Sequence, residues 1–267
     1  MAADSLILAS ARSATRALFD LLMPPACMAC KAPVATPISF CGDCYAALKP
    51  ISGARCLQCA VPLPLKWQTE THCLGCLSEP PRFDRTAAPF LYDGPTRQLV
   101  LAFKNGREAY AAPMAAAMLR AAPGWAGPET LVSAVPLHRW RLASRGYNQA
   151  LVLARAIASA TGAPLDPELL LRVKATRSTR GLTRPQRQRN VQGAFRLADG
   201  AKDRISGRDI LLIDDVMTSG ATASAAAGVL KRGGAARVSV LVHARVAATD
   251  MAPYVEGARS QDDHGQS

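Results

Sequence analysis

Short apolar runs alternate with amphipathic segments through the second two thirds of the chain. Three runs are strongly apolar and bounded by turn-forming residues, which predicts buried strands at 131–136, 210–216 and 238–242. Between them, residues 147–161 and 221–231 place apolar side chains at helical spacing and end near glycines, which predicts helices. Parallel strands are joined through helices and buried on both faces. The order therefore predicts an α/β domain with a parallel sheet and flanking helices.

The same pattern divides the chain into four parts. Residues 1–22 have leucines at helical spacing and predict a helical lead-in. Residues 23–81 hold all the cysteines and many prolines, a composition that suits short turns around a metal better than a hydrophobic core. Residues 82–247 form the predicted α/β domain, and the polar residues 248–267 predict a disordered tail.

The positive net charge of the chain predicts an anionic partner. The formal net charge is +12, and residues 139–196 carry 12 Lys and Arg against two acids. This segment predicts a nucleotide, phosphate ester, nucleic acid or membrane surface as partner, whereas for any single arginine simple solvation is the alternative.

The apolar stretches are too short for a membrane span, which needs about 18 consecutive apolar residues. No positive charge precedes the apolar run that starts at Leu6, so we expect no secretory signal, no membrane insertion and a cytoplasmic location. An organelle transit peptide is the alternative for this start of the chain, which is poor in acids and contains arginines.

The cysteines form four Cys-x-x-Cys units. Two thiolates at this spacing wrap one metal ion, and two units complete a tetrahedral site, so the sequence predicts two structural zinc ions with no position open for water. Sequential pairing of the units closes the shorter loops and is favoured. Disulfides and a thioredoxin-like redox pair are the alternatives. The predicted ligand sets are Cys27, Cys30, Cys41 and Cys44, and Cys56, Cys59, Cys73 and Cys76.

The predicted strand at 210–216 ends in Asp214 and Asp215, and a small hydroxyl-rich turn and a helix follow. Ligands of open α/β sheets bind at the carboxyl ends of strands, and a helix N-terminus offers N–H groups to a phosphate. Acids beside a phosphate cradle make sense if they hold ribose hydroxyls, directly or through Mg²⁺. A capped helix start is the alternative. The predicted 5′-phosphate cradle comprises Met217, Thr218, Ser219, Gly220, Ala221 and Thr222.

This segment resembles the phosphoribosyl-pyrophosphate motif of type I phosphoribosyltransferases, in which two acids precede a Thr/Ser-Gly-x-Thr turn. Together with residues 81–84, 99–107, 135–148 and 182–195, it makes nearly the whole chain similar to the ComF family of competence proteins and their GntX-like relatives. The resemblance implies a type I phosphoribosyltransferase fold, a parallel sheet with flanking helices, behind a small Cys-rich double zinc ribbon.

The resemblance also implies a pyrophosphate site. One departure from the family pattern is Thr179, which stands where the family usually carries Gln. Residues 182–190 are basic with few apolar anchors, which predicts a mobile loop, and the resemblance implies that this loop closes over the reaction. The residues expected to contact pyrophosphate are Lys104, His138, Arg139 and Arg141.

The function implied is Mg²⁺-dependent binding of phosphoribosyl pyrophosphate and transfer of the phosphoribosyl group to a nitrogen acceptor, with a role in DNA uptake during natural transformation. No residue stands out as a general base. The alternative is a non-catalytic competence factor that senses phosphoribosyl pyrophosphate, or that binds single-stranded DNA or a DNA-uptake helicase. Base-stacking aromatic residues are scarce in the basic segment, which weighs against sequence-tolerant DNA binding.

Overall fold

The computed structural model describes residues 24–64, 71–175 and 184–247. The predicted helical lead-in, the predicted tail and Thr179 lie outside the described residues. Within the described ranges, no helix combines the length and the apolar character needed to cross a bilayer.

A five-stranded parallel sheet forms the centre of the α/β domain. Its order is β1-β7-β6-β3, and the short β2 continues along β7. β6 is an interior strand that pairs with β3 on one side and β7 on the other. Its carboxyl end is therefore flanked by the ends of other strands. The strands are β1 (Arg85–Ala87), β2 (Phe90–Leu91), β3 (Leu131–Ala134), β6 (Asp209–Met217) and β7 (Arg237–Arg245).

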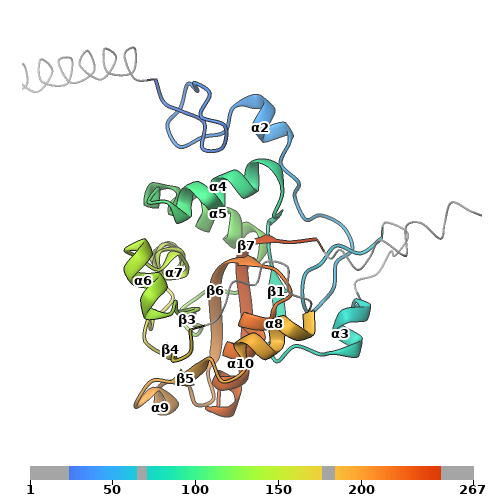
Figure 1. The fold of residues 1–267 in the computed structure, drawn as a ribbon, viewed down its shortest axis with the longest axis vertical. Helices are drawn as coiled ribbons and strands as arrows, with labels where there is room; N and C mark the ends of the chain where they lie inside the picture. Colours follow the sequence, from blue (N-terminus) through green and yellow to red (C-terminus); the bar gives the residue numbers. More distant parts are fainter. Residues whose placement is uncertain (1–23, 65–70, 176–183, 248–267) are drawn as a thin grey trace, which may run out of the picture.

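Helices cover both faces of this sheet (Figure 1). On one face, Leu211 and Ile213 of β6 pack in a cluster with Phe103, Met114 and Leu153. That layer comprises α4 (Gly94–Lys104), η1 (Glu108–Tyr110), α5 (Ala111–Ala121) and α7 (Gln149–Thr161).

On the other face, alternate residues of β6 and β7 pack against α10 and a separate two-stranded antiparallel ribbon. That layer comprises α8 (Arg184–Val191), α9 (Ala201–Ile205), α10 (Ala221–Arg232), β4 (Leu170–Arg172) and β5 (Phe195–Leu197). The predicted fold class, a parallel sheet with flanking helices behind a small Cys-rich module, is therefore confirmed.

The predicted strands and helices of the domain appear close to their expected bounds, except in the basic segment. Residues 184–191 form helix α8 instead of the loop expected there. Two contacts hold this segment as an ordered helix. Val191 is buried in the cluster against α10, and the Gln188 side chain donates to the Glu79 carboxylate over 3.0 Å. Tertiary contacts such as these thus order a segment that has few apolar residues.

Candidate functional site

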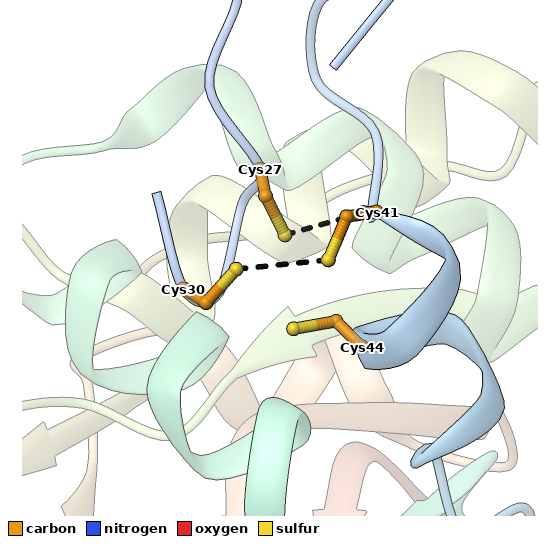
Figure 2. Close-up of side chains that lie close together, drawn as sticks. All are labelled: Cys27, Cys30, Cys41 and Cys44. Atoms are coloured by element: carbon orange, nitrogen blue, oxygen red, sulfur yellow. Dashed lines mark hydrogen bonds between the residues drawn. The ribbon is translucent and has the colours of Figure 1, made fainter. Parts of the chain in front are cut away.

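The eight cysteines gather into two groups of four. Within each group all sulfurs lie within 4.8 Å of one another, and Figure 2 shows the first group pointing at a common centre. The sulfurs of Cys30 and Cys41 are 3.6 Å apart, and those of Cys59 and Cys73 are 3.7 Å apart. Tetrahedral zinc with bonds of about 2.3 Å separates its sulfurs by about 3.8 Å, so both groups fit a zinc ion.

The same distances weigh against disulfides, whose sulfurs are about 2.05 Å apart. None of the eight cysteines is in a disulfide. The groups are Cys27, Cys30, Cys41 and Cys44, and Cys56, Cys59, Cys73 and Cys76, which is the sequential pairing.

Both groups are built by the same local backbone pattern. Cys27 N–H donates to Ala32 O over 2.7 Å, and Cys56 N–H donates to Val61 O over 2.8 Å. The residue after each second cysteine, Lys31 or Ala60, has a positive φ of 69° or 56°. The third cysteine of each group is the N-cap of a five-residue helix and the fourth lies within that helix, which is α2 (Gly42–Ala46) or α3 (Leu74–Ser78). The module is thus two copies of one metal-binding knuckle pair.

The two acids at the end of β6 lie on opposite faces of the sheet. Side chains alternate along a strand, so Asp214 shares the face of Leu212 and Asp215 shares the face of Ile213. The pair predicted to act together therefore has two different environments.

Asp215 is buried and engaged by a cation. Its carboxylate lies 2.8 Å from Lys104 Nζ at the end of α4. The turn after Lys104 is held by Tyr147, whose hydroxyl donates to Phe103 O and accepts from Gly106 N–H over 3.3 Å. Two segments distant in sequence, 99–107 and 135–148, thus meet at the edge of the sheet where β6 ends.

His243 lies on β7 next to Asp215, between the paired residues 214–242 and 216–244. It is 1% exposed and lies beside the backbone of Met114, which favours the charged imidazole but does not offset its burial. Burial lowers the pKa of His243 to about 4, so the imidazole is neutral at physiological pH.

Asp214 faces the α10 side, where Arg172 of β4 contributes positive charge. Burial raises the pKa of the Asp214 carboxyl to about 7, and the negative charge of Asp215 acts in the same direction. For Arg172, burial lowers the pKa first and the nearby charge of Arg141 lowers it further. Arg172 therefore brings positive charge to the side of Asp214, and Arg141 lies within electrostatic range of Arg172.

The turn between β6 and α10 has the form expected of an anion cradle. Gly220 precedes the helix with φ at 78°, a left-handed conformation that favours glycine. A glycine has no side chain to cap the first N–H groups of α10. Ser219 Oγ accepts from Ala221 N–H over 3.4 Å, while Thr218 is exposed and Thr222 half-buried. The first turn of the twelve-residue α10 thus presents N–H groups and hydroxyls at the carboxyl end of β6.

The residues predicted to hold pyrophosphate divide into two groups. Lys104 pairs with Asp215, and Arg141 interacts electrostatically with Arg172, which lies near Asp214. His138 is buried and caps α6 (Arg139–Arg145), where its Nδ1 accepts from Trp140 N–H over 3.4 Å. Arg139 is exposed and lies 5.6 Å from the centre of the Trp140 ring. A structural role therefore accounts for His138 in this structure.

Sequence reasoning did not single out Arg172, His243 or Arg245. Arg172 was one arginine of a basic segment, and no local pattern marks it. His243 and Arg245 could have been found from the sequence, since they are ionisable residues in the apolar strand 237–245. Charged groups are rarely buried without partners, so such residues are candidates for a functional role.

The sequence is similar to a known domain family and to known bacterial proteins. A family model described as a double zinc ribbon domain matches residues 18–77. The DNA utilization protein YhgH of Salmonella typhimurium is 31% identical over 229 residues, which cover 82% of this chain and 96% of that protein. Competence protein F of Haemophilus influenzae is 30% identical over 208 residues, which cover 75% of this chain and 88% of that protein.

Among solved structures, that of the allosteric regulatory enzyme of purine biosynthesis is similar with a TM-score of 0.32 and 19% identity. The match covers 54% of this chain and 26% of that one.

Proposed function

The chain belongs to the family of DNA utilization protein YhgH and competence protein F, and on that premise we propose that it binds phosphoribosyl pyrophosphate with Mg²⁺ and transfers the phosphoribosyl group to a nitrogen acceptor. The junction of β6 and α10 carries the proposal. There a carboxylate pair, a left-handed glycine and a helix N-terminus follow one another at a sheet edge. A ribose 5-phosphate needs these groups for its hydroxyls and its phosphate.

The two acids take different roles in this proposal. Asp215 is already paired with Lys104, so it orients that ammonium group toward the ligand. Asp214, whose Oδ1 accepts from Asp215 N–H over 2.9 Å, makes no ion pair among the described residues, and in this proposal it accepts from the ribose hydroxyls. The first N–H groups of α10 and the hydroxyls of Thr218 and Thr222 bind the 5′-phosphate.

In the reaction, the bond from sugar C1 to the pyrophosphate oxygen breaks, and its electron pair leaves with pyrophosphate. A nitrogen lone pair of the acceptor forms the new bond to C1, and the acceptor then releases a proton. Lys104, Arg141 and Arg172 supply positive charge where the leaving group becomes more negative. Mg²⁺ would neutralise part of the pyrophosphate charge when bound. The carboxylates at the sheet edge have the oxygen donors that this ion prefers.

Calorimetric titration with phosphoribosyl pyrophosphate and Mg²⁺ tests the binding step. Replacing both Asp214 and Asp215 by Ala is expected to weaken binding at least about 100-fold, because hydrogen bonds to charged groups are lost. Asp209→Asn, at the other end of the same strand, is the matched control. Unchanged binding in the double variant would discard this site. Pyrophosphate release with a panel of bases and amines tests the transfer step.

A groove between α8 and α10 favours single-stranded DNA as a second ligand. It has a volume of about 550 Å³, and Arg82, Arg189 and Arg232 line it with no acid among the described lining residues. A Cβ at Gly228 would lie 3.0 Å from Arg82 Nη1 and 3.4 Å from Arg232 Nη1, so both guanidinium groups lie over this glycine. Clustered cations of this kind suit a phosphodiester backbone.

Fluorescence anisotropy of a labelled oligonucleotide over a salt series tests this second function. Replacing Arg82 and Arg232 by Met is expected to weaken binding and to reduce the slope of log K against log salt by about 1.4, at about 0.7 per phosphate contact. Arg155→Met, an exposed arginine of α7 across the sheet, is the control. An unchanged slope in the double variant would remove the groove as a DNA site.

Two predictions from the sequence concern a partner protein and the cellular location. A DNA-uptake helicase is proposed to dock on the Cys-rich module, where Leu57, Leu74 and Leu77 are 45%, 58% and 63% exposed. Such leucines are candidates for a partner contact rather than for the core. Location in the cytoplasm stays a prediction.

A further inference from the structure

Arg245, the last residue of β7, is a buried cation surrounded by backbone carbonyls. It is 5% exposed. Its Nε donates to Cys59 O over 2.9 Å. Its Nη1 donates to Met217 O over 3.2 Å, to Val246 O over 2.8 Å and to Thr218 O. One guanidinium group therefore joins the second Cys₄ group to the start of the phosphate cradle.

The charge of the second Cys₄ group explains why a cation is buried here. Zinc with four thiolates carries a net charge of about −2. None of the ion pairs found among the described residues pairs Arg245 with a carboxylate. Arg245 also lies close enough to the Cys59 side chain for the two groups to interact electrostatically. The metal-bound group is thus the anionic partner that a buried guanidinium requires.

The contacts of Arg245 also orient the cradle. In a trans peptide the C=O and the following N–H point in opposite directions. Holding the carbonyls of Met217 and Thr218 toward Arg245 therefore turns the N–H groups of Thr218 and Ser219 away from it. These are the first N–H groups of the turn proposed to receive the 5′-phosphate.

A second contact joins the same knuckle to the same cradle. Gln58 lies between Cys56 and Cys59, and its Nε2 donates to Pro81 O and to Phe83 O, each over 3.0 Å. The Phe83 ring comes within 3.6 Å of the position that a Cβ of Gly220 would take. The second knuckle pair therefore supports both Gly220 and the turn before it.

The first Cys₄ group has different neighbours. Met28, between Cys27 and Cys30, packs in the cluster of Val100 and Phe103 on the opposite face of the sheet. Lys31 Nζ lies 3.2 Å from the Tyr110 hydroxyl. The two metal groups are chemically alike but contact different faces of the domain, as Figure 1 shows for α2 and α3.

We propose that the second Cys₄ group belongs to the ligand-binding apparatus, and that Arg245 is the positioning residue that transmits its state to residues 217–220. With zinc bound, Arg245 is held and the cradle keeps its anion-binding shape. When the metal is lost, the knuckle no longer holds Arg245 in place and the cradle loosens. The identity of the ligand rests on the proposed function, whereas the coupling between the metal group and the cradle does not.

Amide hydrogen exchange of residues 217–222 in the full chain tests the coupling without any ligand. Cys76→Ser in the second group is expected to speed exchange there about 10-fold or more, because bonds from a charged donor are weakened. Cys44→Ser, the same change in the first group, is the matched control and is expected to leave that exchange within about twofold. Equal effects of the two variants, or no effect of Cys76→Ser, would overturn the coupling.

Arg245→Met keeps the apolar stem and removes the donors, so it tests the coupling in a chain whose cysteines are intact. We expect it to speed the same exchange and to weaken binding of phosphoribosyl pyrophosphate with Mg²⁺ about 10- to 100-fold, with zinc content unchanged. Arg245→Lys is expected to restore part of both effects. Arg237→Met, at the exposed start of the same strand, is the control.

The outcomes separate the two proposals. If the wild type fails to bind the sugar but the exchange pattern holds, the proposed ligand is wrong and the coupling stands. If the wild type binds and Arg245→Met binds within about twofold with unchanged exchange, the coupling is wrong and the proposed function stands. If Cys76→Ser does not fold, Arg245→Met decides alone.

Discussion

Replacing Asp214 by Asn is predicted to stabilise the free protein while removing its ligand binding. The pKa of Asp214 in the folded protein is about 7, against an ordinary value of 3.8, chiefly because of burial. Between these two pH values the folded state holds a proton that the unfolded state has released. The free energy of unfolding therefore falls as the pH rises through this window, and Asn, which cannot ionise, avoids the loss.

The magnitude follows from the width of the window. Each pKa unit corresponds to about 1.4 kcal/mol, so the stability advantage of Asp214→Asn over the wild type should grow by about 2 kcal/mol between pH 5.5 and pH 8. Above about pH 7 the advantage should be constant, because the Asp214 carboxyl is then ionised in both states. Over the same range, affinity of the wild type for phosphoribosyl pyrophosphate is expected to rise as Asp214 becomes a carboxylate.

Urea unfolding of both proteins at pH 5.5 and pH 8, at fixed zinc, measures this difference, and the contribution of the metal groups cancels in the comparison. Asp215→Asn is the contrasting variant. It leaves Lys104 without its carboxylate at 2.8 Å, so it should be less stable than the wild type at both pH values. A stability difference for Asp214→Asn that does not change with pH would refute the assignment of the raised pKa to this residue.

Three further predictions concern the metal, the cradle and the groove. Elemental analysis of freshly reduced protein should find about two zinc ions per chain, and finding none would contradict the metal sites. Gly220→Ala places a side chain at a φ of 78°, which should cost about 1 kcal/mol in urea unfolding and should abolish binding of phosphoribosyl pyrophosphate in calorimetry. In Gly228→Ala, the new Cβ would lie 2.5 Å from Arg82 Cδ. DNA affinity by anisotropy should fall while the thermal midpoint holds or rises, since Ala favours the helix by about 1 kcal/mol, and a fall in both would point to a packing defect instead.

Local patterns determined the parts of this protein whose partners are near in sequence. Four Cys-x-x-Cys units predicted two Cys₄ groups, because each unit binds through a short turn and the loops between units are brief. The acids, small turn and helix after β6 predicted the cradle, because strand, turn and helix are contiguous there. Even the separation of Asp214 from Asp215 follows from the two-residue period of a strand.

Only the tertiary structure decided which distant side chains act on those local features. Lys104 meets Asp215 across 111 positions, and Arg245 meets Cys59 across 186, through contacts that no spacing rule encodes. Helix α8 also depends on contacts between residues distant in sequence, because Val191 packs against α10 and Gln188 donates to Glu79 next to α3. Burial and charge pairing are properties of the folded neighbourhood. The chain by itself therefore determined the turn between β6 and α10 and the two cysteine groups, and folding decided that one buried arginine contacts both.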